Sequence, residues 1–239
     1  MAKTNKKEAL GLDVQLSKSE AFIEKHLKQI GIVLAAICVV VIGIYLWNNY
    51  QDKQEKEAAN AISKSQMAFA QTQYQQALDG DGNTKGFLKI IKDYSGTKTA
   101  NLAKAYAGLC YYNLDKFDDA IKMLSDYDTK DDAVISPSVL EALGNCYVEK
   151  GDVEKGAETI LKAAKLADND AVTPVFLLHA GQLYESLQKP EKALELYKEI
   201  KEKYYRSSLA NEIDKYIERA RCLTSSEKSR LLCVNVPLT

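Results

Sequence analysis

The sequence predicts an all-α protein, with a single N-terminal transmembrane helix followed by a series of helix–turn–helix units and a C-terminal capping helix. Three observations predict this fold. An uncharged apolar run extends from Ile30 to Trp47. Helix breakers are scarce, with 4 prolines and 12 glycines among 239 residues, while the abundant Ala, Leu, Lys and Glu favour helix. Tyrosines recur at intervals of 37, 36 and 37 residues, at Tyr74, Tyr111, Tyr147 and Tyr184.

The apolar run is long enough to cross a membrane. Residues 30–47 contain no charged residue and no Asn, Gln, Ser, Thr or Pro. As a helix they span about 27 Å, close to the roughly 30 Å hydrocarbon core of a bilayer. Tyr45 and Trp47 stand at the far end, where aromatic rings favour the lipid–water interface. A buried core helix is the alternative, but such a helix normally carries some polar residues.

The charges that flank the run predict its orientation. Six lysines precede it, whereas the twenty residues after it carry Lys53, Lys56 and Lys64. Because positive charge is retained in the cytoplasm, residues 1–29 are expected to be a cytoplasmic tail and the rest to cross the membrane. A cleaved signal peptide is disfavoured by the long preceding region and by the absence of a small-residue cleavage site. Ile37 before Cys38 also disfavours a lipoprotein.

The remainder of the chain divides into three segments. Residues 48–63 contain neither Gly nor Pro, and are expected to continue the helix as a stalk. Residues 64–221 carry the repeated pattern and are expected to form one domain. Residues 222–239 show no helical period and are expected to be a disordered or loosely attached tail.

Small residues recur in phase with the tyrosines. Gly108, Gly144 and Gly181 precede a tyrosine by three residues, and a small residue follows each of these tyrosines by nine, at Ala120, Gly156 and Ala193. This pattern resembles the tetratricopeptide repeat, a helix–turn–helix unit of about 34 residues. A small residue in the first helix (helix A) allows the second (helix B) to approach closely. Repeats are expected to begin near Lys64, Asn101, Pro137 and Pro174.

Both ends of the repeat array depart from this pattern. In the first repeat Gln71 stands in place of the glycine and Asn83 in place of the second small residue. After the last repeat, Ser208 is expected to start one more helix, in which Glu218 and Arg221 replace the glycine and the tyrosine. A terminal helix has no successor and needs a polar outer face, so this helix is expected to cap the array.

The sequence offers no constellation for catalysis or cofactor binding, so no enzyme activity and no cofactor are expected. The two histidines, His26 and His179, are predicted to lie on opposite sides of the membrane, which disfavours a histidine metal site. The segment 79–83 is similar to the start of a calcium loop, but Thr84 and Ile90 stand where a glycine and a glutamate are needed. The net charge of −1 gives no reason to expect a nucleic-acid partner.

The cysteines do not form a disulfide framework. Cys110 and Cys146 occupy equivalent places in successive repeats, and helices that pack at about 8–10 Å leave them too far apart for a disulfide. We therefore expect both to be buried small hydrophobic residues. Whether Cys222 and Cys233 pair is left open by the sequence.

The resemblance to tetratricopeptide repeats implies a concave surface, lined by positions 2, 5, 9, 12 and 13 of each A helix. These positions combine apolar, amide and acidic side chains without lysine or arginine, which disfavours an acidic C-terminal peptide as ligand. They suit an extended polypeptide or a folded protein. The candidate partner-binding residues are Thr72, Gln75, Gln76, Leu109, Tyr112, Asn113, Glu141, Asn145, Val148, Glu149, Leu178, Gln182 and Glu185.

The whole layout, from a short charged tail through one span and a stalk to the repeats, resembles the YfgM-like proteins of bacterial inner membranes. That resemblance implies a periplasmic domain with the Sec translocon and periplasmic chaperones as partners. The first hypothesis is therefore a periplasm-facing adaptor or chaperone for proteins that leave the translocon. The second is a structural scaffold of an envelope assembly or signalling complex, with one fixed folded partner.

Overall fold

The computed structural model describes residues 4–130, 132 and 134–224. Within these residues the prediction of an all-α helical repeat protein is confirmed, and the strands are the short β1 (Gly80–Asp81) and β2 (Thr84–Lys85). The chain divides into two compact units, Met1–Gln54 and Glu55–Thr239. The predicted C-terminal tail lies outside the described residues from 225 onward.

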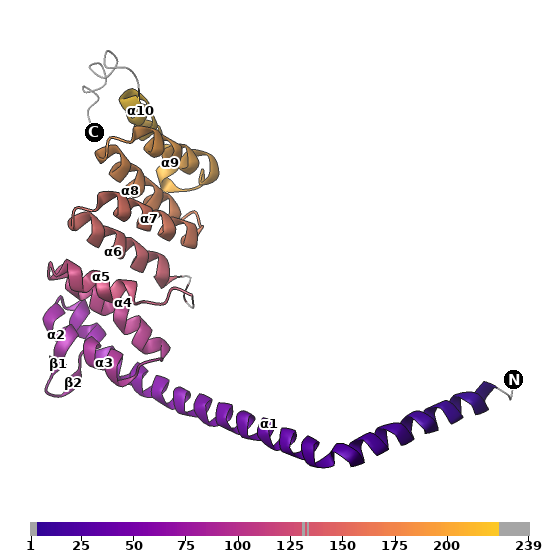
Figure 1. Cartoon of the computed structure of the whole chain (residues 1–239). Coiled ribbons are helices and arrows are strands. Elements are labelled where there is room, and N and C mark those ends of the chain that lie inside the picture. The colour runs from indigo at the N-terminus through magenta and orange to yellow at the C-terminus, as the bar shows by residue number, and fades with distance from the viewer. Residues whose placement is uncertain (1–3, 131, 133, 225–239) are drawn as a thin grey trace. The chain divides into compact units, whose positions relative to one another are not determined.

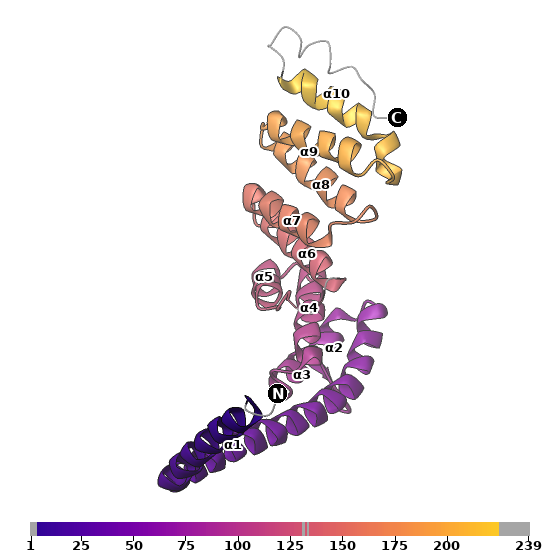
Figure 2. The same ribbon diagram turned by 90° about the vertical axis from the view of Figure 1, so that its right-hand side faces the viewer.

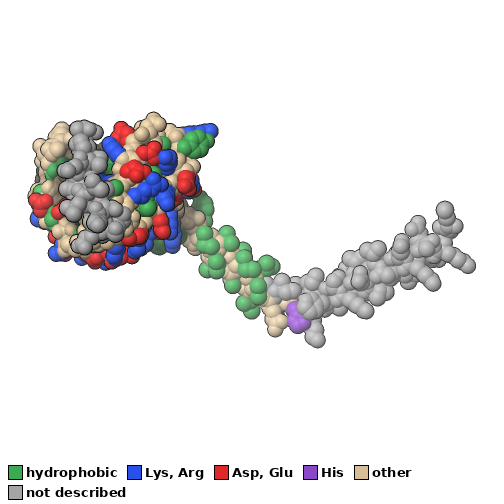
Figure 3. Space-filling model, turned by 90° about the horizontal axis from the view of Figure 1, so that it is seen from above, with side chains coloured by type: hydrophobic (Ala, Val, Ile, Leu, Met, Phe, Trp, Pro, Cys, Tyr) green, Lys and Arg blue, Asp and Glu red, His purple; other side chains and the backbone are tan. Residues whose placement is uncertain are grey.

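The first unit consists of the N-terminal part of helix α1 (Thr4–Ala70). From Gly31 onward this helix is long and apolar enough to cross a membrane, by length and composition, and none of its most apolar window is buried. Ile32 is 70% exposed and Trp47 is 62% exposed, and Figure 3 shows hydrophobic side chains along this part of the helix. Because soluble proteins rarely expose so continuous an apolar surface, the helix is a candidate membrane span.

The second unit is a series of helices in which each packs against its neighbours in the sequence (Figures 1 and 2). The C-terminal part of α1 begins it, and the 3₁₀-helix η1 precedes the last α-helix. After α1 the helices are α2 (Tyr74–Asp79), α3 (Phe87–Asp93), α4 (Lys98–Asn113), α5 (Phe117–Ser125), α6 (Ile135–Glu149), α7 (Val153–Ala167), α8 (Thr173–Ser186), α9 (Pro190–Lys203), η1 (Ser208–Asn211) and α10 (Ile213–Thr224).

Turns of one geometry define the helix pairs. Asp115, Gly151 and Gln188 have positive φ angles of 57°, 86° and 57°. Each lies two residues after one helix ends and two residues before the next begins. This left-handed residue reverses the chain within a short turn. Helices α4, α6 and α8 are therefore A helices, and α5, α7 and α9 are their B helices.

The first repeat follows the same rule in a different register from the predicted one. Thr72 has φ 59° and lies between the end of α1 at Ala70 and the start of α2 at Tyr74. Helix A of this repeat is therefore the C-terminal part of α1, and Tyr74 begins helix B. The predicted register, which placed Tyr74 inside helix A, is wrong by six residues.

An inserted hairpin explains the shift. Strands β1 and β2 pair antiparallel between α2 and α3, so that 43 residues separate the turns at Thr72 and Asp115 instead of 36 or 37. Counting back 37 residues from Tyr111 reaches Tyr74 by coincidence. Ser65, not Gln71, stands at the position that glycine occupies in the other three repeats. Its hydroxyl donates to the Lys85 carbonyl at 2.6 Å, which ties the hairpin to helix A.

In the other three repeats the glycines allow close helix packing, as expected from the sequence. A Cβ added at Gly144 would lie 2.6 Å from Ile160 Cγ1 of α7. One at Gly108 would overlap Leu124 of α5, and one at Gly181 would overlap Tyr197 of α9. Each B helix therefore packs directly against the backbone of its A helix.

The helix expected as a stalk is in part a component of the repeat domain. The second unit starts at Glu55, and Ala58 and Ile62 are buried in a core that also contains Phe87 and Ile90 of α3. The first helix of the domain thus begins about two turns after Trp47.

The C-terminal end is capped by α10. Ile213, Ile217 and Ala220 are buried, while Glu218 and Arg221 are exposed, which gives the polar outer face that was predicted. The single helix expected from Ser208 is divided into η1 and α10.

The cysteines have distinct environments. Cys110 and Cys146 are buried free thiols, as expected. Cys222, at the end of α10, is disulfide-bonded, whereas Cys233 lies outside the described residues.

Candidate binding face of the repeat domain

Ten of the thirteen candidate residues lie on three successive A helices. They occupy equivalent positions relative to the turns. For example, Leu109, Asn145 and Gln182 each lie six residues before the left-handed turn residue of their own repeat. All ten are partly or fully exposed. This set is termed the A-helix face and consists of Leu109, Tyr112, Asn113, Glu141, Asn145, Val148, Glu149, Leu178, Gln182 and Glu185.

Contacts between neighbouring A helices show that this face is continuous. Between α4 and α6, burial raises the pKa of the Tyr112 hydroxyl, and the nearby carboxylate of Glu149 raises it further. Between α6 and α8, Glu141 Oε1 lies 3.8 Å from His179 Nδ1. Side chains from α4, α6 and α8 therefore lie side by side.

The last residue of the face is held by the capping helix. Arg219 of α10 donates to both carboxylate oxygens of Glu185, at 3.3 Å from Nε and 2.6 Å from Nη2. The Glu185 side chain is only 12% exposed. This bidentate pair fixes α10 against α8. Glu185 therefore stabilises the packing of the capping helix in addition to lining the A-helix face. Arg219 was not among the predicted residues, because the pair joins positions 34 residues apart.

The three candidates from the first repeat are placed differently. Thr72 lies in the turn, and Gln75 and Gln76 lie on α2, a B helix. Gln75 donates to Asp79 at 2.5 Å and accepts from Lys116 at 3.3 Å. The expectation that these residues extend the row of A-helix positions is wrong, because the register differs by six. The equivalent residues are Gln66, Phe69 and Ala70.

Phe69 shows how the corrected register continues the face. Its ring packs edge-on against Tyr106 of α4, with centroids 5.2 Å apart, and against Tyr74 of α2 at 5.6 Å. The ring is only partly exposed. The end of the face toward α1 is therefore aromatic and firmly packed.

The A-helix face combines apolar, amide and acidic groups. Leu109, Val148 and Leu178 are partly exposed apolar side chains, one from each A helix. Asn145 and Gln182 add amide groups, which can both donate to and accept from a peptide backbone. Such a surface can bind an extended chain through apolar contacts while its amides satisfy the backbone.

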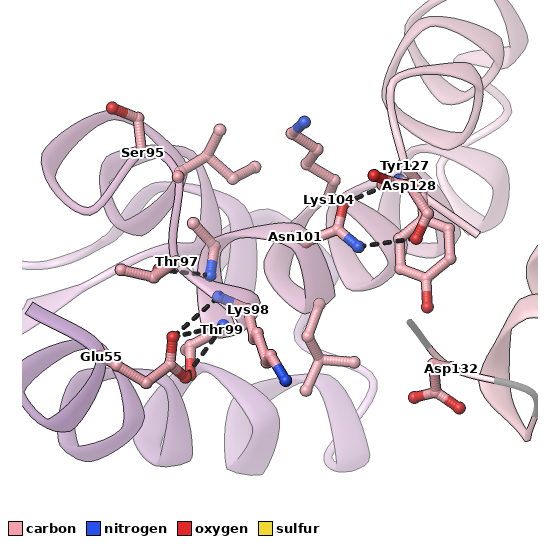
Figure 4. A pocket seen from close by; sticks show the side chains of 14 residues that line it. Glu55, Ser95, Thr97, Lys98, Thr99, Asn101, Lys104, Tyr127, Asp128 and Asp132 are labelled. Carbon is pink, nitrogen blue, oxygen red and sulfur yellow. Dashed lines mark hydrogen bonds between the residues drawn. The ribbon is translucent and has the colours of Figure 1, made fainter. Parts of the chain in front are cut away.

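A hollow of about 530 Å³ lies beside the start of α4 (Figure 4). It arises because α5 has 9 residues, whereas α7 has 15 and α9 has 14, so an irregular loop replaces the last turns of helix B. Asn101 bridges this loop: its Nδ2 donates to the Asp128 carbonyl at 2.9 Å and its Oδ1 accepts from the Asp128 N–H at 2.8 Å.

The Glu55 carboxylate and the Asn101 amide at this hollow are already used within the domain. The Glu55 carboxylate accepts from the N–H of Lys98 at 2.7 Å, the N–H of Thr99 at 3.1 Å and the Thr99 hydroxyl at 2.6 Å. A carboxylate is favourable at this position, because a helix N-terminus carries partial positive charge and unpaired N–H groups. The hollow is thus a structural junction, and the A-helix face is the better candidate for binding.

The buried thiols are unreactive. Burial raises the pKa of Cys110 to about 12 and that of Cys146 to about 11. Because the thiolate is the nucleophile, both side chains remain inert at neutral pH. They serve as small core residues.

Comparison with known protein families agrees with this geometry. Residues 137–170 match the family model of the tetratricopeptide repeat. The matched segment contains nearly all of α6, the Gly151 turn and α7. No curated protein matches the chain. Repeats of this type build extended surfaces for binding proteins and peptides, so the domain is assigned to protein–protein interaction.

Proposed function

We propose that this chain is a single-span protein of the bacterial inner membrane whose repeat domain faces the periplasm and binds polypeptides on the A-helix face. It would act as an adaptor or chaperone for proteins that leave the Sec translocon. The observation that carries this proposal is the row of partly exposed apolar and amide side chains at equivalent positions of three successive A helices.

The candidate membrane span supports a role close to the membrane. A tether keeps the domain near its partners and raises their effective concentration without any new contact. The excess of lysines before the span favours a cytoplasmic N-terminus and a domain on the opposite side. The resemblance of the layout to YfgM-like proteins points to the translocon and to periplasmic chaperones.

The chemistry of the face supports sequence-tolerant binding. Apolar contacts are non-directional, and amide side chains pair with backbone groups that every polypeptide carries. A domain of this kind can hold many different clients. A scaffold with one folded partner would instead contact a single protein.

Site-specific photo-crosslinking in intact membranes tests the proposal. A crosslinker at Leu109 or Leu178 is expected to give many adducts, including translocon subunits and newly exported proteins. The matched control is a crosslinker at Lys162, which is exposed on helix B α7 and is expected to give few. A single discrete adduct would favour the scaffold, and equal labelling from both faces would contradict the proposed binding face.

Protease added to spheroplasts tests the orientation. The repeat domain is expected to be digested while the tail before the span is protected. Protection of the repeat domain would place it in the cytoplasm and would rule out the periplasmic role.

A further inference from the structure

The centre of the A-helix face carries negative charge that the rest of the domain leaves uncompensated. Glu149 is exposed, and it forms no ion pair with any cation in the described part of the chain. The basic group beside Glu141 is the His179 imidazole, with Nδ1 at 3.8 Å from Oε1. That ring carries a positive charge only when it is protonated. Two carboxylates on α6 are therefore available to a ligand.

Two cations beside the face are already paired with other carboxylates. Lys150, the residue after Glu149, pairs with Asp118 of α5 at 3.0 Å. Arg219 pairs with Glu185 at 2.6 Å. The A helices α4, α6 and α8 contribute no lysine or arginine to the A-helix face as defined above. A ligand would therefore meet Glu141 and Glu149, which form no ion pair with lysine or arginine in the described part of the chain.

The apolar side chains of the face are distributed over all three A helices. Leu109, Val148 and Leu178 come from successive A helices. They precede the left-handed turn residue of their repeats by six, three and ten residues, so they lie at different heights along the helices. An extended ligand with several apolar residues can therefore contact more than one A helix. Glu141 and Glu149 lie on either side of Val148 along α6, where basic residues of the same ligand can reach them.

We propose that the A-helix face selects extended polypeptide segments that combine apolar residues with lysine or arginine. This inference rests on the proposed function and names the partner class for the same face. Charge complementarity favours a cationic segment, whereas an acidic segment would place like charges together. The carboxylates thus add a selection by charge to binding that is otherwise tolerant of sequence.

Peptide binding to the full chain in detergent micelles tests this selection. Three fluorescent peptides of equal length are compared by anisotropy: repeats of Ser-Leu-Lys, of Ser-Leu-Gln and of Ser-Leu-Glu. Two exposed ion pairs are expected to make the lysine peptide bind about fivefold more tightly than the glutamine peptide. The glutamate peptide should bind most weakly. High salt should remove the advantage of the lysine peptide, because exposed charges are screened.

A pair of double variants assigns the effect to the face. The variant E141Q/E149Q is expected to bind the lysine and glutamine peptides equally well. The matched control E191Q/E195Q removes two carboxylates that are exposed on α9 and should keep the fivefold preference. Loss of the preference in E141Q/E149Q alone would also exclude binding of the cationic peptide to the micelle as its source.

The outcomes separate this inference from the proposed function. Equal binding of the lysine and glutamine peptides by the unmodified chain would overturn the charge selection and leave polypeptide binding intact. Persistence of the preference in E141Q/E149Q would also overturn it. Failure to bind any of the peptides, together with the absence of crosslinks from Leu109 and Leu178, would overturn both.

Discussion

Glu55 is expected to hold the first helix of the repeat domain to the N-terminus of α4. Its carboxylate accepts three hydrogen bonds there, from the Lys98 and Thr99 N–H groups and the Thr99 hydroxyl. The substitution Glu55→Ala removes all three. Thr97 still caps the same helix by accepting from the Ala100 N–H at 3.0 Å, so the helix start should persist with two amides unpaired.

The size of the effect follows from these contacts. Loss of a capping side chain costs about 0.5–2 kcal/mol, and loss of a negative charge at a helix N-terminus costs about 0.3–1 kcal/mol. The sum is about 2 kcal/mol for the free energy of unfolding. For a domain of this size that corresponds to a melting temperature lower by about 4–8 °C.

Thermal unfolding of the full chain in detergent, followed by circular dichroism, measures this change. Glu57→Ala is the matched control, because Glu57 is exposed two residues away on the same helix and should change stability by less than about 0.5 kcal/mol. Hydrogen exchange gives a local readout, since the amides of Lys98 and Thr99 should exchange faster in Glu55→Ala alone. Equal melting temperatures for Glu55→Ala and Glu57→Ala, with the Lys98 and Thr99 amides still protected, would show that Glu55 does not hold the first helix to α4.

Three further changes test the packing of the domain. Gly144→Leu should destabilise it by about 2 kcal/mol, because a Cβ at this position would already lie 2.6 Å from Ile160 and overpacking is costly although leucine favours helix. Cys110, whose pKa burial raises to about 12, should resist maleimide at pH 8 in the folded protein and react after unfolding, as read by mass spectrometry. Arg219→Ala should cost about 2 kcal/mol by leaving Glu185 without its charged partner, and hydrogen exchange should quicken in α10 first.

Matched variants separate these effects from general perturbation. Gly82→Ala places its Cβ in open space and should leave the melting temperature nearly unchanged. Arg221→Ala breaks an exposed pair with Glu218 on the same helix, which is worth little. A Gly144→Leu protein as stable as Gly82→Ala would contradict the packing argument. Labelling of Cys110 in the folded chain would contradict its burial, and equal losses for the two arginine variants would contradict the role given to Arg219.

Local patterns in the sequence were sufficient for much of this fold. The candidate membrane span is a continuous apolar run, so its composition and length mark it as a candidate. The second to fourth repeats have turns at Asp115, Gly151 and Gln188 with nearly constant spacing. Periodicity therefore located their A helices and ten of the candidate binding residues.

The remaining features depend on contacts or insertions that periodicity does not record. The hairpin between α2 and α3 changed the spacing, so the first repeat was placed six residues too late. Glu55 reaches α4 across more than 40 residues of sequence, and Arg219 reaches Glu185 across 34. The hollow beside α4 follows from the shortness of α5, and no residue pattern marked that boundary. Ser65 was a signal for the correct register. It is a small residue seven positions before the turn residue Thr72, just as Gly108 stands seven positions before the turn residue Asp115.

Crosslinking from Leu109 and from Lys162, in the full chain in intact membranes, shows most directly whether the A-helix face binds partners. Abundant adducts with other polypeptides are expected from Leu109, on the A-helix face, and few from Lys162 on helix B. Abundant adducts from Lys162 with none from Leu109 would show that partners bind another surface and not the A-helix face.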